Sequence, residues 1–513
     1  MTTTLASPRG AADASAGFPA HGYIDVNAQL GPRFGGASGA PIEDVTREAR
    51  AHGIQYSLVR HRTALVGESE LGNRALLDAC EDDAGLVPVA VLSVDRTGDM
   101  DRAARLAARV AGFWLEGRAV PGSGLAAEAV VRSAARTGRP LFVPISGWGS
   151  ATTIGAATEG LGVPVVLVGS HYTTSVEDLA AGRRYDHLHL DTSSMAHFRA
   201  IETAVGVIGA ERVLLGTGSP LRAIQSSLNA ILSAAIPEEA KRSILAGNAA
   251  RLFGLPTGPL ELPEVVRPER AFDVHTHSGP LPWDVPDLDD DALMPELAHR
   301  TGTRYAVASS VLAIAADLEA GNRRTVEGCA RMPDRLGYLV ADPNHIDASR
   351  DQLRRWGDAP GIVGVKVHTQ WSARHTGSPQ IAALFEVLAD HGRPVKIHND
   401  GPDWDQHLLR IARRHRRLPI IIAHAGLGFP NLEGALIARQ ADNLYAEMSS
   451  SFAHLPTVRQ FLRTIPRERI LFGTDAPLLD PAFVLGTYQD AQIPGADQPG
   501  VYWDNAARLF GIS

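Results

Sequence analysis

The chain carries one sequence pattern twice, and this repeat limits the folds that it can adopt. The stretch "ERVLLGTGSP" at 211–220 resembles "ERILFGTDAP" at 468–477, and "GNAARLFGL" at 247–255 resembles "DNAARLFGI" at 504–512. Between the two halves, residues 256–269 contain four prolines and one glycine, which is typical of a linker. A chain of 513 residues is also too long for one ordinary hydrophobic core. The repeat therefore predicts two domains of similar structure.

Each half alternates short β-rich runs with longer segments of helical character. Runs such as "FDVHTH", "IVGVKVH" and "PVKIH" recur, and each half contains eight of them. Strands that alternate with helices imply a parallel sheet, and eight such units fit a closed (β/α)₈ barrel. The alternative, an open doubly wound sheet, usually begins with a GxGxxG turn, which follows neither first strand. We predict two tandem (β/α)₈ TIM-like barrels at 23–255 and 271–513, a flexible tail at 1–22 and a linker at 256–270.

Charge and cysteine content exclude several classes of protein. The net charge of −8 and the lack of a basic tract argue against nucleic-acid binding. The N-terminus lacks the apolar core of a secretory signal, and no uncharged apolar run approaches the roughly 20 residues of a membrane helix. The two cysteines, Cys80 and Cys329, are too few for a disulfide framework and favour a reducing compartment. We expect a cytoplasmic protein that acts on a small molecule and binds neither nucleic acid nor membrane.

Ionisable residues collect at the strand ends of the second half, which is where barrel active sites lie. His275 and His277 end the first strand, and because they are two residues apart they point to the same side. Imidazole and carboxylate groups are the usual ligands of zinc and similar divalent ions. The later strands of this half end in further candidates: Lys366 and His368 on the fourth, His398 on the fifth, His424 on the sixth and Asp475 on the eighth.

The first half serves as an internal control for this set. Its apolar runs match those of the second half, but the polar set is replaced throughout. The set is therefore not needed to build a barrel, and we predict that the second copy is the working site while the first is a scaffold without metal ligands. The replacements are Asn27 for His275, Gln29 for His277, Trp114 for Lys366, Pro144 for His398, Gly169 for His424 and Gly218 for Asp475.

The motifs "DVHTH", "VKIH", "IIAHAG" and "GTDAP" resemble those of the amidohydrolase superfamily. They are most similar to its amidohydrolase-related branch, which includes aminocarboxymuconate-semialdehyde and resorcylate decarboxylases and several lactone and amide hydrolases. The resemblance covers 271–513 and, more faintly, 23–255. It implies that His275, His277, His398 and Asp475 bind one divalent metal ion, zinc or alternatively manganese. His424 would polarise the substrate or move a proton, and Asp475 could take a proton from a water activated by the metal.

Other polar residues have less defined roles. In other branches of the superfamily a carboxylated lysine on the fourth strand bridges two metals, but here we expect Lys366 to be structural or to contact substrate. His368 and Arg374 lie in the loop "HTQWSARH", where an arginine would suit a substrate carboxylate; an ordinary solvated loop is the alternative. Trp283 follows the first strand of the second half and could form a wall of the pocket.

The resemblance and the intact histidine pair together predict a metal-dependent hydrolase of an amide, a lactone or a related carbonyl compound. A non-oxidative decarboxylase is the alternative with the same metal. A non-catalytic protein made of two binding barrels is a third, which the intact ligand set opposes. Because similar proteins commonly act as homodimers, the resemblance also implies that the first barrel packs on the second as a pseudo-dimer. Glu447 corresponds to Asp191, and the presence of an acid in both copies predicts a structural role for it.

Overall fold

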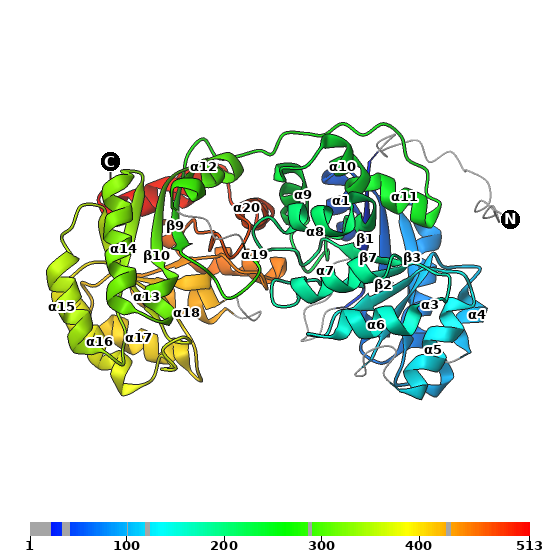
Figure 1. Ribbon diagram of the computed structural model, residues 1–513, viewed down its shortest axis with the longest axis horizontal. Coiled ribbons are helices and arrows are strands. Elements are labelled where there is room, and N and C mark those ends of the chain that lie inside the picture. Colours follow the sequence, from blue (N-terminus) through cyan, green and yellow to red (C-terminus); the bar gives the residue numbers. More distant parts are fainter. Residues whose placement is uncertain are drawn as a thin grey trace. The chain divides into compact units, whose positions relative to one another are not determined.

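The computed structural model describes residues 22–32, 42–99, 101–117, 124–285, 290–426 and 432–512. The chain divides into two compact units. The first consists of Met1–Met195 and Ala200–Glu264, and the second of Ala196–Arg199 and Val265–Ser513. In each unit the strands run through the interior and the helices lie outside them (Figure 1).

The first unit contains an eight-stranded sheet whose strands follow the order of the sequence, each pairing in parallel with the next. Val26 N donates to Leu215 O at 2.8 Å and Gly218 N donates to Asn27 O at 2.8 Å, which joins the first strand to residues just after the last. The sheet therefore closes into the predicted barrel. Its strands are β1 (Tyr23–Leu30), β2 (Ile54–His61), β3 (Leu86–Ser93), β4 (Gly112–Glu116), β5 (Leu141–Pro144), β6 (Val165–Val168), β7 (Leu188–Asp191) and β8 (Val213–Leu214).

The second unit repeats this sheet with β9 to β16, again in sequence order and parallel. Val274 N donates to Phe472 O at 2.9 Å, and Thr276 forms a parallel bridge with Ala476, so this sheet also closes. The strands are β9 (Ala271–Ser278), β10 (Thr303–Ser310), β11 (Arg335–Val340), β12 (Ile362–His368), β13 (Val395–His398), β14 (Ile420–Ile422), β15 (Leu444–Glu447) and β16 (Ile470–Leu471).

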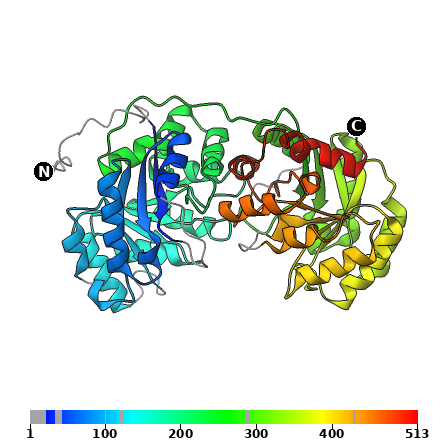
Figure 2. The same cartoon turned by 180° about the vertical axis from the view of Figure 1, so that it is seen from behind.

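The helices follow the strands, as the alternating pattern predicts, and Figure 2 shows them covering the strands from the opposite side. Those of the first unit are α1 (Ile42–Ala51), α2 (Arg62–Leu65), α3 (Ser69–Asp82), α4 (Arg102–Leu106), α5 (Leu125–Ala135), α6 (Ser150–Thr158), α7 (Ser175–Arg184), α8 (Ala200–Ile208), α9 (Ile224–Ser233), α10 (Glu238–Arg242) and α11 (Asn248–Phe253). Those of the second are α12 (Asp290–Thr301), α13 (Val311–Ala315), α14 (Leu318–Arg331), α15 (Ile346–Trp356), α16 (Pro379–His391), α17 (Trp404–Arg414), α18 (Glu433–Ala438), α19 (Leu455–Thr464), α20 (Pro481–Asp490) and α21 (Asn505–Phe510).

Most residues of the interior strands are apolar because helices cover the outside and side chains fill the inside. In β14 all three residues are isoleucines with no exposed surface. At one end of the second barrel, the rings of Phe272, Trp503 and Phe510 pack together, with the Phe272 ring centroid 5.6 Å from each of the other two. The polar residues of the site lie at the other end, where the strands terminate.

Residues 255–268, which include most of the predicted linker, form neither helix nor strand. The predicted tail, apart from Gly22, lies outside the described residues. Within the described ranges, no helix has the length and apolar character that crossing a membrane requires.

Candidate metal centre

Three of the predicted ligands meet where the second barrel closes. His275 and His277 lie two residues apart near the end of β9, which is buried along its whole length. The Asp475 amide donates to His275 O at 2.7 Å, so the residues after β16 lie against β9. As a result, Asp475 Oδ1 is 3.2 Å from His275 Nε2 and 3.0 Å from His277 Nε2. All three side chains are almost completely buried.

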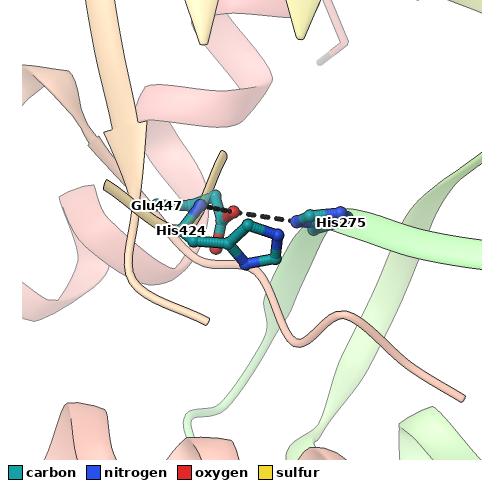
Figure 3. A group of neighbouring side chains, drawn as sticks. All are labelled: His275, His424 and Glu447. Atoms are coloured by element: carbon teal, nitrogen blue, oxygen red, sulfur yellow. Dashed lines mark hydrogen bonds and ion pairs between the residues drawn. The ribbon is translucent and has the colours of Figure 1, made fainter. Parts of the chain in front are cut away.

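Glu447, at the end of β15, fixes the orientation of His275 (Figure 3). Its Oε1 lies 2.8 Å from His275 Nδ1 and accepts from the His424 amide at 2.6 Å, and its Oε2 accepts from the Ser449 amide at 2.7 Å. Because both oxygens of this group accept backbone amides, it acts as the acceptor toward His275 as well, so Nδ1 of His275 carries the proton and Nε2 presents its lone pair toward Asp475. Carboxylates commonly hold metal-binding histidines in this way.

Gly473, in the "GTD" motif, leaves room for the Glu447 carboxylate because it has no side chain. A Cβ added to Gly473 would lie 2.9 Å from Glu447 Oε2 and 3.0 Å from His275 Cβ. In the first barrel, a Cβ on Gly216 would lie 2.2 Å from Asp191 Oδ2. The acid and the glycine beneath it are thus kept in both copies, which supports the predicted structural role of Glu447.

His424 lies beside this group, after β14, with a positive φ of 59°. Its Nδ1 is 2.8 Å from the carbonyl oxygen of Ser449, which can only accept, so the proton resides on Nδ1 and Nε2 is left to exchange a proton or contact a ligand. Its ring centroid is 4.9 Å from that of His275 and 4.9 Å from that of His398. His398 in turn stacks on His368, with centroids 4.3 Å apart and planes 11° apart.

Two buried lysines line the same region. Lys366 Nζ is 3.4 Å from His275 Nε2, so the fourth strand does deliver its lysine to the site. Burial lowers the pKa of Lys366 to about 8, although the charges of Asp475 and Glu447 oppose the change. Lys396 on β13 donates to Val274 O at 2.9 Å, and burial holds its pKa well below the usual range. Sequence reasoning missed Lys396, because a lysine inside the apolar run "PVKIH" resembles any strand residue with an exposed side chain.

The charge states of the cluster suit a cation. Burial lowers the pKa of His277 and holds that of His275 well below its usual range, so both rings are neutral near pH 7. Burial alone would raise the pKa of Asp475, but the hydrogen bond from His277 and the neighbouring His424 and Lys366 outweigh it and keep the carboxyl ionised.

The donor set passes a simple test of fit. Ligand atoms of His275, His277 and Asp475 all lie within 4.8 Å of one another, as do those of His275, His424 and Glu447. Two neutral imidazole nitrogens and a carboxylate in a buried site are ligands that zinc and manganese accept. The first group would hold the ion. Among the described residues His398 belongs to neither group, so its role as a fourth ligand remains a prediction.

The remaining candidates are exposed or only partly buried, or make other contacts. Arg374 is exposed, and its Nε donates to Asn344 Oδ1 at 2.6 Å. Trp371, which is 43% exposed, places its ring edge-on to His368 with centroids 6.5 Å apart. Trp283 is half-buried after β9. Contact of Arg374, Trp283 or His368 with substrate remains a prediction.

The fold and site place this chain among the (β/α)₈ enzymes whose first and last strands bring histidine and aspartate side chains to the C-terminal rim. The family model described as Amidohydrolase matches residues 43–255 and again 272–512, and the chain therefore belongs to the amidohydrolase family. The double match agrees with the tandem repeat. No curated protein matches the chain.

Several solved structures resemble parts of the chain. A dihydroxybenzoic acid decarboxylase from Polaromonas sp. JS666, with bound manganese and the inhibitor 2-nitroresorcinol, is 19% identical, with a TM-score of 0.38 over 47% of this chain and 97% of that one. The 5-carboxyvanillate decarboxylase of Sphingomonas paucimobilis is 14% identical, with a TM-score of 0.40 over 48% and 99%. A putative 2-pyrone-4,6-dicarboxylic acid hydrolase from Pseudomonas putida is 16% identical, with a TM-score of 0.37 over 47% and 98%.

The contact between Glu447 and His275 leads to a testable expectation. Glu447→Gln keeps the shape of the side chain but removes the charge that favours a proton on His275 Nδ1. Loss of such a partner typically lowers metal affinity by about 10- to 100-fold, and we expect an effect of that size in a competition titration with a fluorescent chelator. Asp191→Asn at the corresponding position of the first barrel is the matched control and should leave the affinity unchanged. Equal affinity of Glu447→Gln and the wild type would contradict this role.

Proposed function

We propose that the second barrel is a metal-dependent hydrolase that cleaves an amide, a lactone or a related carbonyl bond in a small molecule. The convergence of two buried imidazole nitrogens on Asp475 Oδ1, at 3.2 and 3.0 Å, is the observation that carries the proposal. A divalent cation bound to such a set lowers the pKa of water toward neutrality and polarises a carbonyl oxygen.

Side chains of the protein would accept and donate the protons of this reaction. Asp475 is ionised and buried, so it is the acceptor for a proton from the attacking water. His424 is held through Nδ1 by Ser449 O, so it would polarise the substrate carbonyl through Nε2 only as the imidazolium. Alternatively, the proton that Asp475 takes from the water would pass through His424 Nε2 to the leaving group. Lys366 stays an unmodified amine in this proposal, and its ammonium near His275 would attract a negatively charged part of the substrate.

A substrate screen tests the proposal. The metal-loaded full chain is incubated with small amides, lactones and aromatic acids, and the products are identified by mass spectrometry. Hydrolysis adds water and gives a free acid without loss of carbon. A decarboxylase acting through the same metal would instead release carbon dioxide, and that product would replace the hydrolase assignment. Metal binding with no turnover of any compound would favour a binding protein.

The metal itself can be measured directly. We expect about one zinc or manganese ion per chain in protein expressed in supplemented medium, as determined by elemental analysis. His277→Ala removes one of the three clustered ligands and should lower occupancy sharply while leaving the circular dichroism spectrum unchanged. Gln29→Ala, at the corresponding position of the first barrel, should leave occupancy within error. Two ions per chain together with a carboxylated Lys366 would contradict the single-metal site.

A further inference from the structure

The first barrel has replaced the metal-binding pair with two arginine contacts. Asn27 and Gln29 on β1 stand where β9 has His275 and His277. Arg60, near the end of β2, donates from Nη1 to Asn27 Oδ1 at 2.5 Å. Arg62, the first residue of α2, donates from Nη1 to Gln29 Oε1 at 3.5 Å. Both guanidinium groups therefore reach the positions from which imidazoles face the centre in the second barrel.

Arg60 is held firmly in this place. It is only 6% exposed, and its guanidinium carbon lies 3.8 Å from the centroid of the Trp114 ring, which is the counterpart of Lys366. Trp114 is itself fixed by a hydrogen bond from Nε1 to Glu116 Oε2 at 2.7 Å. A guanidinium stacked on an indole is oriented by the ring, so Arg60 presents its donors in one direction.

Within the described ranges neither guanidinium group makes a direct ion pair, although the charges of Asp191, Glu116 and Asp25 act on Arg60 from farther away. In the same ranges the Nε atoms of Arg60 and Arg62 are buried without a hydrogen-bond partner. The nearby Asp191 is already engaged: its Oδ2 accepts from Asn27 Nδ2 at 2.8 Å and its Oδ1 from the Gly169 amide at 3.0 Å. Burial lowers the pKa of Arg60 to about 10, so the group is still charged at neutral pH.

A buried N–H group without an acceptor is costly, and a guanidinium binds a carboxylate well because its parallel N–H groups match the two oxygens. We propose that the C-terminal mouth of the first barrel binds a small carboxylate through Arg60 and Arg62. A singly charged carboxylate suits this mouth better than a phosphate dianion, because the charges of Asp191, Glu116 and Asp25 also act on Arg60. The first barrel is then a ligand-binding domain. Its site binds an anion at the positions where the second barrel would bind a cation.

Calorimetric titration of the full chain with benzoate tests this site, with benzamide as the neutral control of the same shape. The titration is repeated in excess 1,10-phenanthroline, a neutral chelator that carries no carboxylate, which removes any contribution from a metal in the second barrel. We expect saturable binding of about one benzoate per chain in both conditions and none of benzamide. Arg62→Gln should weaken benzoate binding by about tenfold or more, since it removes a charged donor. Arg74→Gln, on the exposed side of α3, should leave it unchanged.

A second variant guards against a general effect on folding. Arg60→Lys keeps the charge but loses the planar donor pair, so it should also weaken benzoate binding while the circular dichroism spectrum is retained. His277→Ala should leave benzoate binding intact, which separates this site from the proposed hydrolase centre. The proposal is overturned if no saturable binding appears up to about 10 mM benzoate, if benzamide binds equally well, or if Arg62→Gln and Arg60→Lys both bind as the wild type does.

Discussion

Asp475→Asn is expected to reduce turnover by about 10²- to 10⁴-fold, the range attributed to a positioned general base. The carboxylate is buried beside two imidazoles and kept ionised, so it is the one group of the cluster that combines negative charge with contact to both histidines. Asparagine has nearly the same shape but cannot accept a proton at neutral pH. The measurement is kcat on the first substrate that the screen identifies.

The backbone conformation at position 475 can accommodate asparagine. Asp475 has a φ of 62°, and asparagine tolerates this left-handed region better than most residues, so little strain is added. Metal content is measured on the same sample. Loss of a metal ligand would lower the metal content, whereas loss of the base alone would lower turnover at unchanged metal content. Asp347→Asn on the exposed start of α15 is the control and should behave as the wild type. Wild-type turnover by a fully metal-loaded Asp475→Asn protein would show that the proton-transfer role is wrong.

Local sequence pattern predicted the barrels because strand and helix periodicity is a local property. Runs such as "PIIIAH" are apolar throughout when both faces are buried, and the polar residue that follows each run marks the rim. This is why His275, His277 and Asp475 could be assigned to one site before any distance was known. The comparison of Asp191 with Glu447 predicted a structural carboxylate, and in the structure this carboxylate also orients His275.

What the sequence could not supply is pairing between distant residues. Which imidazole nitrogen carries the proton depends on Glu447, which lies 172 residues from His275. Arg60 was not predicted as a site residue because its counterpart in the second barrel is Ser309, which is not one of the predicted ligands. The charged residue at the end of the apolar run "YSLVR" was the signal that could have identified it. The assignment of Ala196–Arg199 to the second unit has no local signature, since these residues lie in the first half of the repeat.

That short segment adds several contacts to the second unit. Ala196 O accepts from the Asp480 amide at 2.7 Å, and His197 forms an antiparallel bridge with Leu479. Leu479 N also donates to Asp475 O at 3.1 Å, so the segment adjoins the turn that carries the metal-site aspartate. Phe198 is fully buried, with the guanidinium carbon of Arg300 5.0 Å from its ring centroid.

Arg300 shows why the loss of this segment would matter. It is 1% exposed, and it pairs through Nη1 with Asp480 Oδ2 at 2.8 Å and through Nε with Glu296 Oε2 at 3.1 Å. Arg199 pairs with the other oxygen of the Glu296 carboxylate. Removal of Phe198 and Arg199 would expose this buried ion-pair network to water and free the turn that begins at Asp475.

We therefore expect residues 258–513, expressed alone, to aggregate or to lose most activity, although every predicted ligand is present. Adding separately prepared 1–257 should restore part of the activity. In the full chain, Phe198→Ala should cost about 3–5 kcal/mol of unfolding free energy, because it empties a fully buried aromatic site, whereas Trp148→Ala at an exposed position should change it little. A fragment 258–513 that is monomeric, soluble and fully active would show that the second barrel needs nothing from the first half, and the scaffold role proposed for the first copy would then have to be abandoned.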